Sequence, residues 1–399
     1  MTRLEESDVS VTPEAPVRQR SRNRWGTWSC GLTLLLATAI SAANLVAQGD
    51  PPARANTGAP VLTKRLDVGE VNAEQSTVVL KSVLSATRVG GTLAVADFEA
   101  RKLVFYDSTG RVRRVLSEND KYGLDGFRTA MWIGRCAPGT AFVYDPLLSR
   151  ITMLDAAGTA ERSWRAPPAS MRITCSTHGT FASMDLPYRS APRSVWSLEP
   201  AWAPLHLLDV GGNFIFTIDS VDVGIARPAG RMTSVALSRD RLFVGVGDRC
   251  EVQVWDFSGR HMDNIRCSAR PMRLTRTQYD SIITIQFGRR PGADSLLAVW
   301  REAPMPGELP PYRALHATPS GTLWLTLSSL AESQLRLEVL RGEGSGSQYV
   351  TVPVRGNVLE VGDDYIIVEY RTPAGAEHVA VFDVAWSGAA RSRQSSSRP

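Results

Sequence analysis

The sequence predicts an all-β protein, a six-bladed β-propeller with four-stranded antiparallel blades. Short apolar runs alternate with turns that contain Gly and Asp, which is the pattern of strands joined by tight turns. The pattern recurs six times along the chain, with decreasing regularity. A single four-stranded sheet does not bury both of its faces, so the six sheets must pack on one another. Radial packing of this kind gives a propeller.

The clearest repeats are Gly91–Leu116 and Gly139–Arg165. Each begins with Gly-Thr and an apolar run that ends in Asp, and a D-x-x-G turn starts ten residues after that Asp. Such a turn favours Asp at its first position, where the side chain accepts backbone N–H bonds, and Gly at its last, where φ is positive. The third repeat starts at Gly179, and we expect its third strand at Ser194–Leu198. The other repeats are residues 241–267, 321–342 and 363–384.

A further β-like run precedes each repeat, which brings the strands to four per unit. These runs are residues 82–89, 131–136, 171–175, 233–237, 313–317 and 357–361. The sixth repeat has no outer strand, because only a short stretch follows Val384 before a tail rich in Ser and Arg. Residues 62–69 form an isolated strand pattern upstream of the first repeat. We expect this N-terminal strand to pair with 379–384 and close the last blade.

One segment breaks the period, residues 274–312 between blades four and five. Within it, Leu296, Leu297 and Trp300 have helical spacing, whereas 281–287 is ambiguous between helix and strand. The sequence therefore predicts a partly helical insert, which we expect to cover one edge of the ring.

The two ends of the chain differ from its body. Arginines at 18, 20, 22 and 24 precede the apolar run 31–47, and small residues follow within it, which is typical of a secretory signal. A run of about 17 residues is short for a membrane span, although an uncleaved anchor or a buried helix are the alternatives. The expected organisation is a signal peptide or N-terminal anchor at 1–47, a linker at 48–60, the propeller at 61–387 and a disordered tail at 388–399.

Charge also limits the partners. Residues 48–387 hold 37 basic and 36 acidic side chains. Binding to phosphate backbones needs a basic stripe, so this near-neutral body argues against nucleic acid. We expect an exported protein, periplasmic or extracellular, with membrane contact only if residues 31–47 are not cleaved.

The repeat motifs G-x-L-x-V-x-D and F-D-x-x-G stand here as Gly91–Asp97 with Tyr106–Gly110, and as Gly139–Asp145 with Leu154–Gly158. With them the chain resembles the six-bladed β-propellers related to NHL repeats, in particular the secreted bacterial ones. The resemblance covers about residues 62–387. Its motifs are structural, so it implies the fold and leaves the function open.

Three carboxylates recur at the end of the second strand of consecutive blades: Asp97, Asp145 and Asp185. They form either a cluster that binds a cation or a polyol, or separate caps on their own turns. In an up-and-down blade, the turn after the second strand and the connection to the next blade emerge on the same side. The insert, with Trp300, should therefore share a face with these carboxylates, and we expect that face to bind the ligand.

The sequence contains none of the usual local catalytic motifs in a fitting context. The five histidines are not paired as metal ligands in the sequence, but ligands from different blades meet in a propeller channel, so spacing leaves a Ca or Zn ion there open. We expect no cofactor and a non-catalytic binding or protein-interaction module for an unknown protein or small ligand. The alternatives are a hydrolase, lactonase or lyase with a channel metal, and a membrane-tethered scaffold. The histidines are His178, His206, His261, His316 and His378.

Four cysteines follow the export segment and permit two disulfides. Cys136 and Cys175 occupy matching places in adjacent repeats, and Cys250 and Cys267 lie on the two arms of one hairpin. A two-residue turn places the second pair directly opposite, whereas the three-residue turn that D-x-x-G often makes needs a bulge. We expect the pairs Cys136–Cys175 and Cys250–Cys267, with buried free thiols as the alternative.

Overall fold

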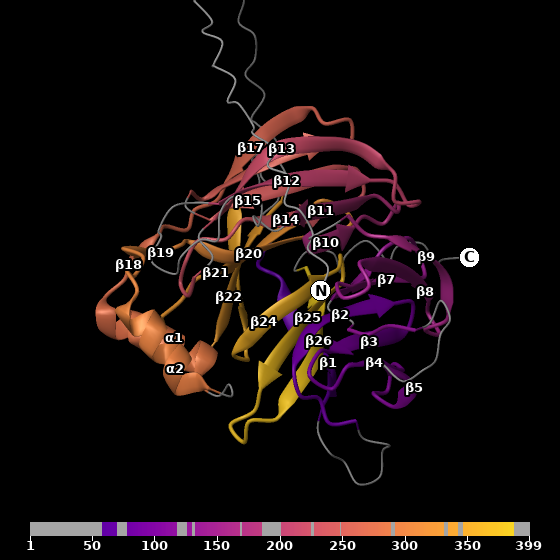
Figure 1. The fold of residues 1–399 in the computed structure, drawn as a ribbon, viewed down its shortest axis with the longest axis horizontal. Coiled ribbons are helices and arrows are strands. Elements are labelled where there is room, and N and C mark those ends of the chain that lie inside the picture. Colours follow the sequence, from indigo (N-terminus) through magenta and orange to yellow (C-terminus); the bar gives the residue numbers. More distant parts are fainter. Residues whose placement is uncertain are drawn as a thin grey trace, which may run out of the picture. The chain divides into compact units, whose positions relative to one another are not determined.

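The structure is a computed structural model. It describes residues 58–69, 78–117, 126–129, 132–167, 170–185, 201–224, 227–247, 249–288, 292–330, 334–341 and 346–386. All of them belong to one compact unit, Asn56–Pro399. Within these ranges, six four-stranded antiparallel sheets are arranged around a common centre (Figure 1). The predicted six-bladed propeller is confirmed.

The first five blades are continuous stretches of chain. Blade 1 has β2 (Val83–Val89), β3 (Thr92–Asp97), β4 (Lys102–Tyr106) and β5 (Val112–Ser117), and blade 2 has β6 (Trp132–Arg135), β7 (Thr140–Asp145), β8 (Arg150–Asp155) and β9 (Ala160–Arg165). Blade 3 has β10 (Ser170–Cys175), β11 (Phe181–Asp185), β12 (Ala201–Leu208) and β13 (Phe214–Gly224). Blade 4 has β14 (Ser234–Leu237), β15 (Arg241–Val246), β16 (Glu251–Asp256) and β17 (His261–Arg266), and blade 5 has β20 (Tyr312–Ala317), β21 (Leu323–Leu327), β22 (Leu335–Leu340) and β23 (Ser347–Val352).

The sixth blade joins the two ends of the propeller. It consists of β24 (Gly356–Val361), β25 (Tyr365–Arg371), β26 (Glu377–Ala385) and, from the N-terminal side, β1 (Val61–Val68). β1 pairs antiparallel with β26, so that Leu62 lies opposite Val384 and Val68 opposite Val379. The predicted closing strand is thereby confirmed.

The inner strands follow one another around the ring in the order β24, β2, β6, β10, β14, β20. Each blade buries both faces, because apolar side chains of neighbouring blades form shared clusters. Between blades 1 and 2, for example, Leu103 and Phe105 pack with Ile133 and Val143. Burial of this kind is the main stabilising contribution to the ring.

Four of the outer hairpins share one turn. In blade 2, the N–H of Gly158 donates to the carbonyl of Asp155 at 3.0 Å, and the Asp155 carboxylate accepts from the N–H groups of Ala157 and Thr159. Gly158 has φ 78°, a value that favours glycine. A register shift follows in the adjoining strands, which is a β-bulge. The same turn starts at Asp107, Asp209 and Asp256.

Blade 3 corrects one expectation. Its third strand is β12, Ala201–Leu208, and not Ser194–Leu198, which lies outside the described residues. The reason lies in the turn after β12: Asp209 and Gly212 form another D-x-x-G turn, in which the Gly212 N–H donates to the Asp209 carbonyl at 3.0 Å. That turn fixes the position of the hairpin.

The insert forms two helices, α1 (Arg276–Phe287) and α2 (Ala293–Glu302), beside the short strands β18 (Met272–Arg273) and β19 (Glu308–Leu309) (Figure 1). Residues 281–287 are helical because Thr275 caps α1 in a reciprocal capping box with Gln278. Among the described residues, neither helix is long and apolar enough to span a membrane. The predicted export segment, 31–47, lies outside the described residues.

Candidate functional site

The recurring carboxylates of blades 1 and 2 bind backbone N–H groups. Asp145, which is 2% exposed, accepts from Arg128 at 2.6 Å and Thr129 at 3.2 Å, ahead of β6. It also accepts from the N–H groups of Leu147 and Leu148 in its own turn. Each such carboxylate ties its turn to the chain entering the same blade, which is the capping alternative. Asp97 does the same with Lys81, Ser82 and Ala100.

Replacement of Asp145 by Ala should lower the free energy of unfolding by about 3 kcal/mol, because four N–H groups, one of them in a buried and three in partly buried hydrogen bonds, lose a charged acceptor. Urea denaturation measures the difference. Asp219→Ala is the matched control, since Asp219 is exposed. Equal midpoints for the two variants would contradict the capping role.

The other two predicted ligand residues have different surroundings. Asp185 lies 3.5 Å from the Nε2 atom of His206, and its Oδ1 atom is buried with no partner among the described residues. Trp300 stacks on Phe287 with ring centroids 6.2 Å apart, inside the small apolar core of the insert. A ligand-binding role for these carboxylates and for Trp300 stays a prediction.

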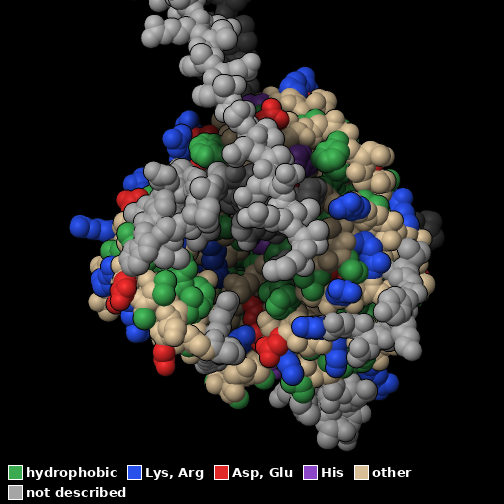
Figure 2. All heavy atoms as spheres, in the orientation of Figure 1, with side chains coloured by type: hydrophobic (Ala, Val, Ile, Leu, Met, Phe, Trp, Pro, Cys, Tyr) green, Lys and Arg blue, Asp and Glu red, His purple; other side chains and the backbone are tan. Residues whose placement is uncertain are grey.

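The insert lies on the predicted face. Its core packs against Leu330, in the loop between β21 and β22, and against Ala229, in the connection between β13 and β14. Turns after second strands and connections between blades therefore meet there, as the connectivity requires. On the face that Figure 2 shows, basic and acidic side chains are interspersed.

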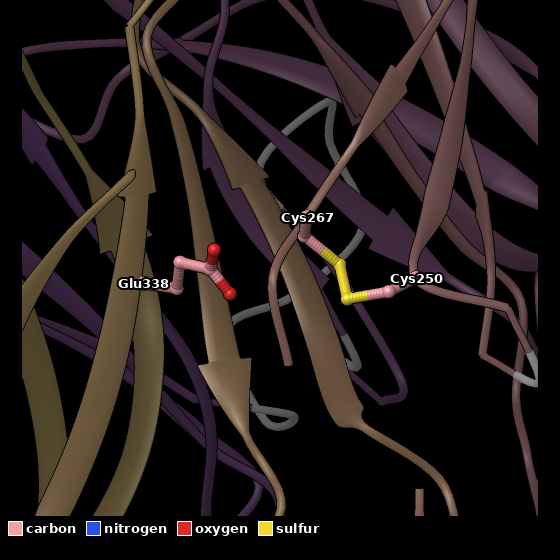
Figure 3. A group of neighbouring side chains, drawn as sticks. All are labelled: Cys250, Cys267 and Glu338. Atoms are coloured by element: carbon pink, nitrogen blue, oxygen red, sulfur yellow. A yellow bond between two sulfur atoms is a disulfide. The ribbon is translucent and has the colours of Figure 1, made fainter. Parts of the chain in front are cut away.

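The structure pairs Cys136 with Cys175 and Cys250 with Cys267, as the sequence predicts, with Cα atoms 4.9 and 5.0 Å apart. A bulge between Val254 and Trp255 restores the register of the second pair. In the described part of the chain, the one group of three metal-ligating side chains is Cys250, Cys267 and Glu338. Figure 3 shows its two sulfurs bonded to each other beside the carboxylate. Glu338 accepts hydrogen bonds from the N–H groups of Ser268 and Ala269.

Charged side chains meet at the centre of the ring, from blades that are not neighbours. Glu360 on β24 accepts from the backbone N–H of Arg135 on β6 at 3.4 Å, although β2 lies between these strands in the ring. The hydroxyls of Thr87 and Tyr365 also donate to Glu360. Burial lowers the pKa of Arg135, but electrostatic interactions with Glu360, Tyr365, Asp363 and Asp364 together outweigh it, and the net shift is upward. This side of the centre is internally paired.

The opposite side is a basic wall made of Arg172 on β10 with Arg313 and His316 on β20. Arg172 donates to the hydroxyl of Ser234 at 3.4 Å, and desolvation lowers its pKa. Arg313 donates to the carbonyl of Gly356 at 2.6 Å, and desolvation lowers its pKa as well, although Glu369 opposes the shift. Among the described residues, the structure gives Arg172 no carboxylate contact.

His316 couples the two parts of this wall. Desolvation lowers its pKa to about 4, and the charges of Arg172 and Arg313 act in the same direction. Its Nε2 atom is buried and has no hydrogen-bond partner among the described residues, yet the side chain keeps part of its surface exposed. β10 and β20 lie on either side of β14, and Arg172 still acts on His316 from the second strand along the ring. Desolvation shifts the pKa of all three side chains although each keeps part of its surface exposed, as expected for groups at the inner edge of the ring.

The pKa of His316 predicts a pH-dependent stability. In the unfolded chain the imidazole of His316 binds a proton below about pH 6.5, whereas in the folded protein it does so only below about pH 4. The free energy of unfolding therefore decreases as the pH falls between these values. The loss amounts to about 3 kcal/mol. Urea denaturation at pH 7 and pH 4 should show it for the wild type, and His316→Gln should lose that much less. Identical pH dependence in both proteins would refute this assignment.

The sequence prediction did not identify Arg172, Arg313 and Ser234. A signal was available, because Arg172 lies within the run 171–175 and Arg313 begins the run 313–317, and both runs are predicted inner strands. A charged residue in an inner strand either faces the channel or is buried.

A groove of ≈ 880 Å³ lies between blades 4 and 5, outside the inner ring. Its lining carries charges of both signs, including Asp240, Asp263, Arg241, Arg266 and Arg341. We place the candidate site at the basic wall instead, because the buried Nε2 atom of His316 has no hydrogen-bond partner among the described residues and Arg172 has no carboxylate contact there.

No protein-family model matches the chain, and no curated protein matches it. Solved structures do. A Bacteroides fragilis protein described as exported is 7% identical, with a TM-score of 0.48 over 85% of this chain and 97% of the other. A Bacteroides vulgatus member of the DUF4221 family is 11% identical, with a TM-score of 0.47 over 83% and 99%. A streptogramin B lyase is 10% identical, with a TM-score of 0.43 over 82% and 98%.

Proposed function

We propose that the protein is an exported, non-catalytic binding module whose ligand enters the central channel of the propeller. The observation that carries the proposal is the basic wall. Arg172 has one long hydrogen bond to Ser234, and the Nε2 atom of His316 has no partner in the described part of the chain. Desolvated polar groups are costly unless they are paired, so a bound ligand would stabilise this arrangement.

The same wall weighs against the metal-dependent alternative. A channel hydrolase, lactonase or lyase would have to hold Ca or Zn beside two guanidinium groups, whose positive charges repel a cation. Metal analysis of the purified protein tests this directly. We expect no stoichiometric Ca or Zn, and one ion per chain would favour the enzyme.

Export is supported by the signal-like run at 31–47 and by the two cysteine pairs, since disulfides persist in oxidising compartments. N-terminal sequencing of the protein recovered outside the cytoplasm should give a start at Asn44 or Gln48. A mature chain that retains residues 31–47 would instead support a membrane-tethered scaffold.

The site of binding is tested by a melting-temperature screen with neutral, cationic and anionic small molecules. Any ligand that raises the melting temperature is measured again on His316→Leu, which replaces the imidazole with an apolar side chain and removes its hydrogen-bonding nitrogens. A smaller increase in the variant supports the channel. An unchanged increase for every ligand found would place the site elsewhere.

A further inference from the structure

This inference rests on the proposed binding function and names the class of ligand. We propose that the channel binds a small anion, a carboxylate or phosphate group, between Arg172 and Arg313, with His316 as a further hydrogen-bonding group. A carboxylate is planar and a phosphate is tetrahedral, but both carry oxygens that accept several hydrogen bonds. The experiment below distinguishes the two groups.

Two arginines on inner strands, Arg135 and Arg172, differ in their electrostatic surroundings. Arg135 lies among Glu360, Asp363 and Asp364, whose charges outweigh its burial. Arg172 has burial as the cause of its shift, and its one described hydrogen bond is to the Ser234 hydroxyl at 3.4 Å. A partly buried guanidinium without a counter-charge is disfavoured, because the cost of its desolvation is not offset. The missing partner of Arg172 is therefore negative.

The two arginines of the basic wall can only donate hydrogen bonds to a ligand. An arginine has five N–H donors and no acceptor. Arg313 donates to the Gly356 carbonyl, and the residue remains exposed, so its other donors are accessible to a ligand. The ligand must supply acceptors. Guanidinium groups match carboxylate and phosphate oxygens in a bidentate geometry.

His316 adds a hydrogen-bonding group to the basic wall without adding a charge at pH 7. With a pKa of about 4, its imidazole is neutral at pH 7 and adds no charge to the wall. A neutral ring still offers one N–H donor to an anion, and which nitrogen carries the proton is set by the bound partner. The wall thus presents two fixed positive charges and one neutral donor from strands on either side of β14.

The acidic side of the channel limits the size of the ligand. Glu360 is held by Tyr365, Thr87 and the N–H of Arg135, so its charge is fixed on the far side of the centre. The Glu360 carboxylate repels an anion, so an anion at the basic wall must be compact to remain apart from it. We expect a single carboxylate or phosphate group to enter the wall, with the rest of the molecule extending along the channel.

The experiment is a calorimetric titration of the full-length exported protein with inorganic phosphate, sulfate, citrate and acetate. Arg172→Met should weaken binding of the preferred anion at least tenfold, as expected for loss of a charge-assisted hydrogen bond. Arg172→Lys keeps the positive charge but not the planar guanidinium, which can donate two parallel hydrogen bonds. Its affinity for the anion should lie between those of Arg172→Met and the wild type. Arg165→Met is the matched control, because Arg165 is exposed on β9, and it should bind as the wild type does.

Stability gives an independent readout. Without an anion, Arg172→Met should melt no lower than the wild type, because a desolvated charge without a carboxylate partner among the described residues is removed. With a saturating anion, the wild type should gain stability and the variant should not. Preference for phosphate and sulfate indicates a phosphate group, and preference for citrate and acetate indicates a carboxylate.

The outcomes separate the two proposals. A neutral or cationic ligand whose binding depends on His316 would overturn the anionic class and keep the channel as the binding site. Equal anion affinity in Arg172→Met and the wild type would overturn the assignment of Arg172. If no ligand of any class responds to the channel variants, both the proposed function and this inference fail.

Discussion

A chain that starts at Ser82 should melt about 10 °C or more below a chain that starts at Gln48. The shorter chain lacks β1, and with it the partly buried Leu62 and Leu66 and the buried Val68. Burial of these side chains contributes about 4 kcal/mol after the cost of ordering the strand. In a domain of this size, each kcal/mol shifts the melting temperature by about 2–4 °C.

Loss of β1 also exposes groups that it satisfies. The Asp67 carboxylate accepts from the hydroxyl of Tyr370 at 2.6 Å and lies 3.0 Å from the Nδ1 atom of the buried His378. Burial raises the pKa of Asp67, but hydrogen bonds from Lys64, Tyr370 and His378 outweigh it and lower the pKa overall. β26 becomes an unpaired edge, which promotes aggregation.

Differential scanning calorimetry and light scattering of both chains measure the two consequences. Asp67→Asn in the longer chain separates the polar contribution of β1 from the rest and should cost less than removal of the strand. Equal melting temperatures for the chains starting at Ser82 and Gln48 would show that β1 does not close the ring.

Removal of the Cys136–Cys175 bond should lower the free energy of unfolding by about 4 kcal/mol. The bond joins residues 39 apart in sequence, so its loss raises the conformational entropy of the unfolded chain. For Cys250–Cys267, with a separation of 17, the expected loss is about 3 kcal/mol. Cys136 is fully buried between blades 2 and 3, so its replacement also perturbs packing. The first bond should therefore matter more.

The test is urea denaturation with and without a reductant. The wild type should lose stability on reduction, and a variant with all four cysteines replaced by Ala should not respond. Non-reducing peptide mapping identifies the pairs. Four free thiols, or crossed pairs between the two sets, would refute the assignment.

Much of the fold is local and could be predicted. Alternating apolar runs and D-x-x-G turns place most strands, and the missing outer strand of blade 6 identifies β1 as its partner. The third strand of blade 3 differs from the prediction because the turn at Asp209 fixes where β12 ends. Turn chemistry, rather than repeat length, sets the position of that hairpin.

The channel is less predictable for a physical reason. Arg172, Ser234 and His316 are 62 and 82 residues apart in sequence, and they meet only because closure of the ring brings inner strands of blades 3, 4 and 5 together. The recurrence of Asp97 and Asp145 was visible, but their partners include N–H groups about 16 residues upstream. Asp97 and Asp145 bind N–H groups of their own repeats, whereas the residues of the basic wall do not recur.

The most direct test of the channel as an anion site is anomalous diffraction from crystals soaked in selenate. The oxygens of a bound selenate should lie within hydrogen-bonding distance of the Arg172 guanidinium, and the selenium peak should disappear in Arg172→Met crystals. Selenium peaks confined to arginines on the outer surface, with none beside Arg172, would contradict the account.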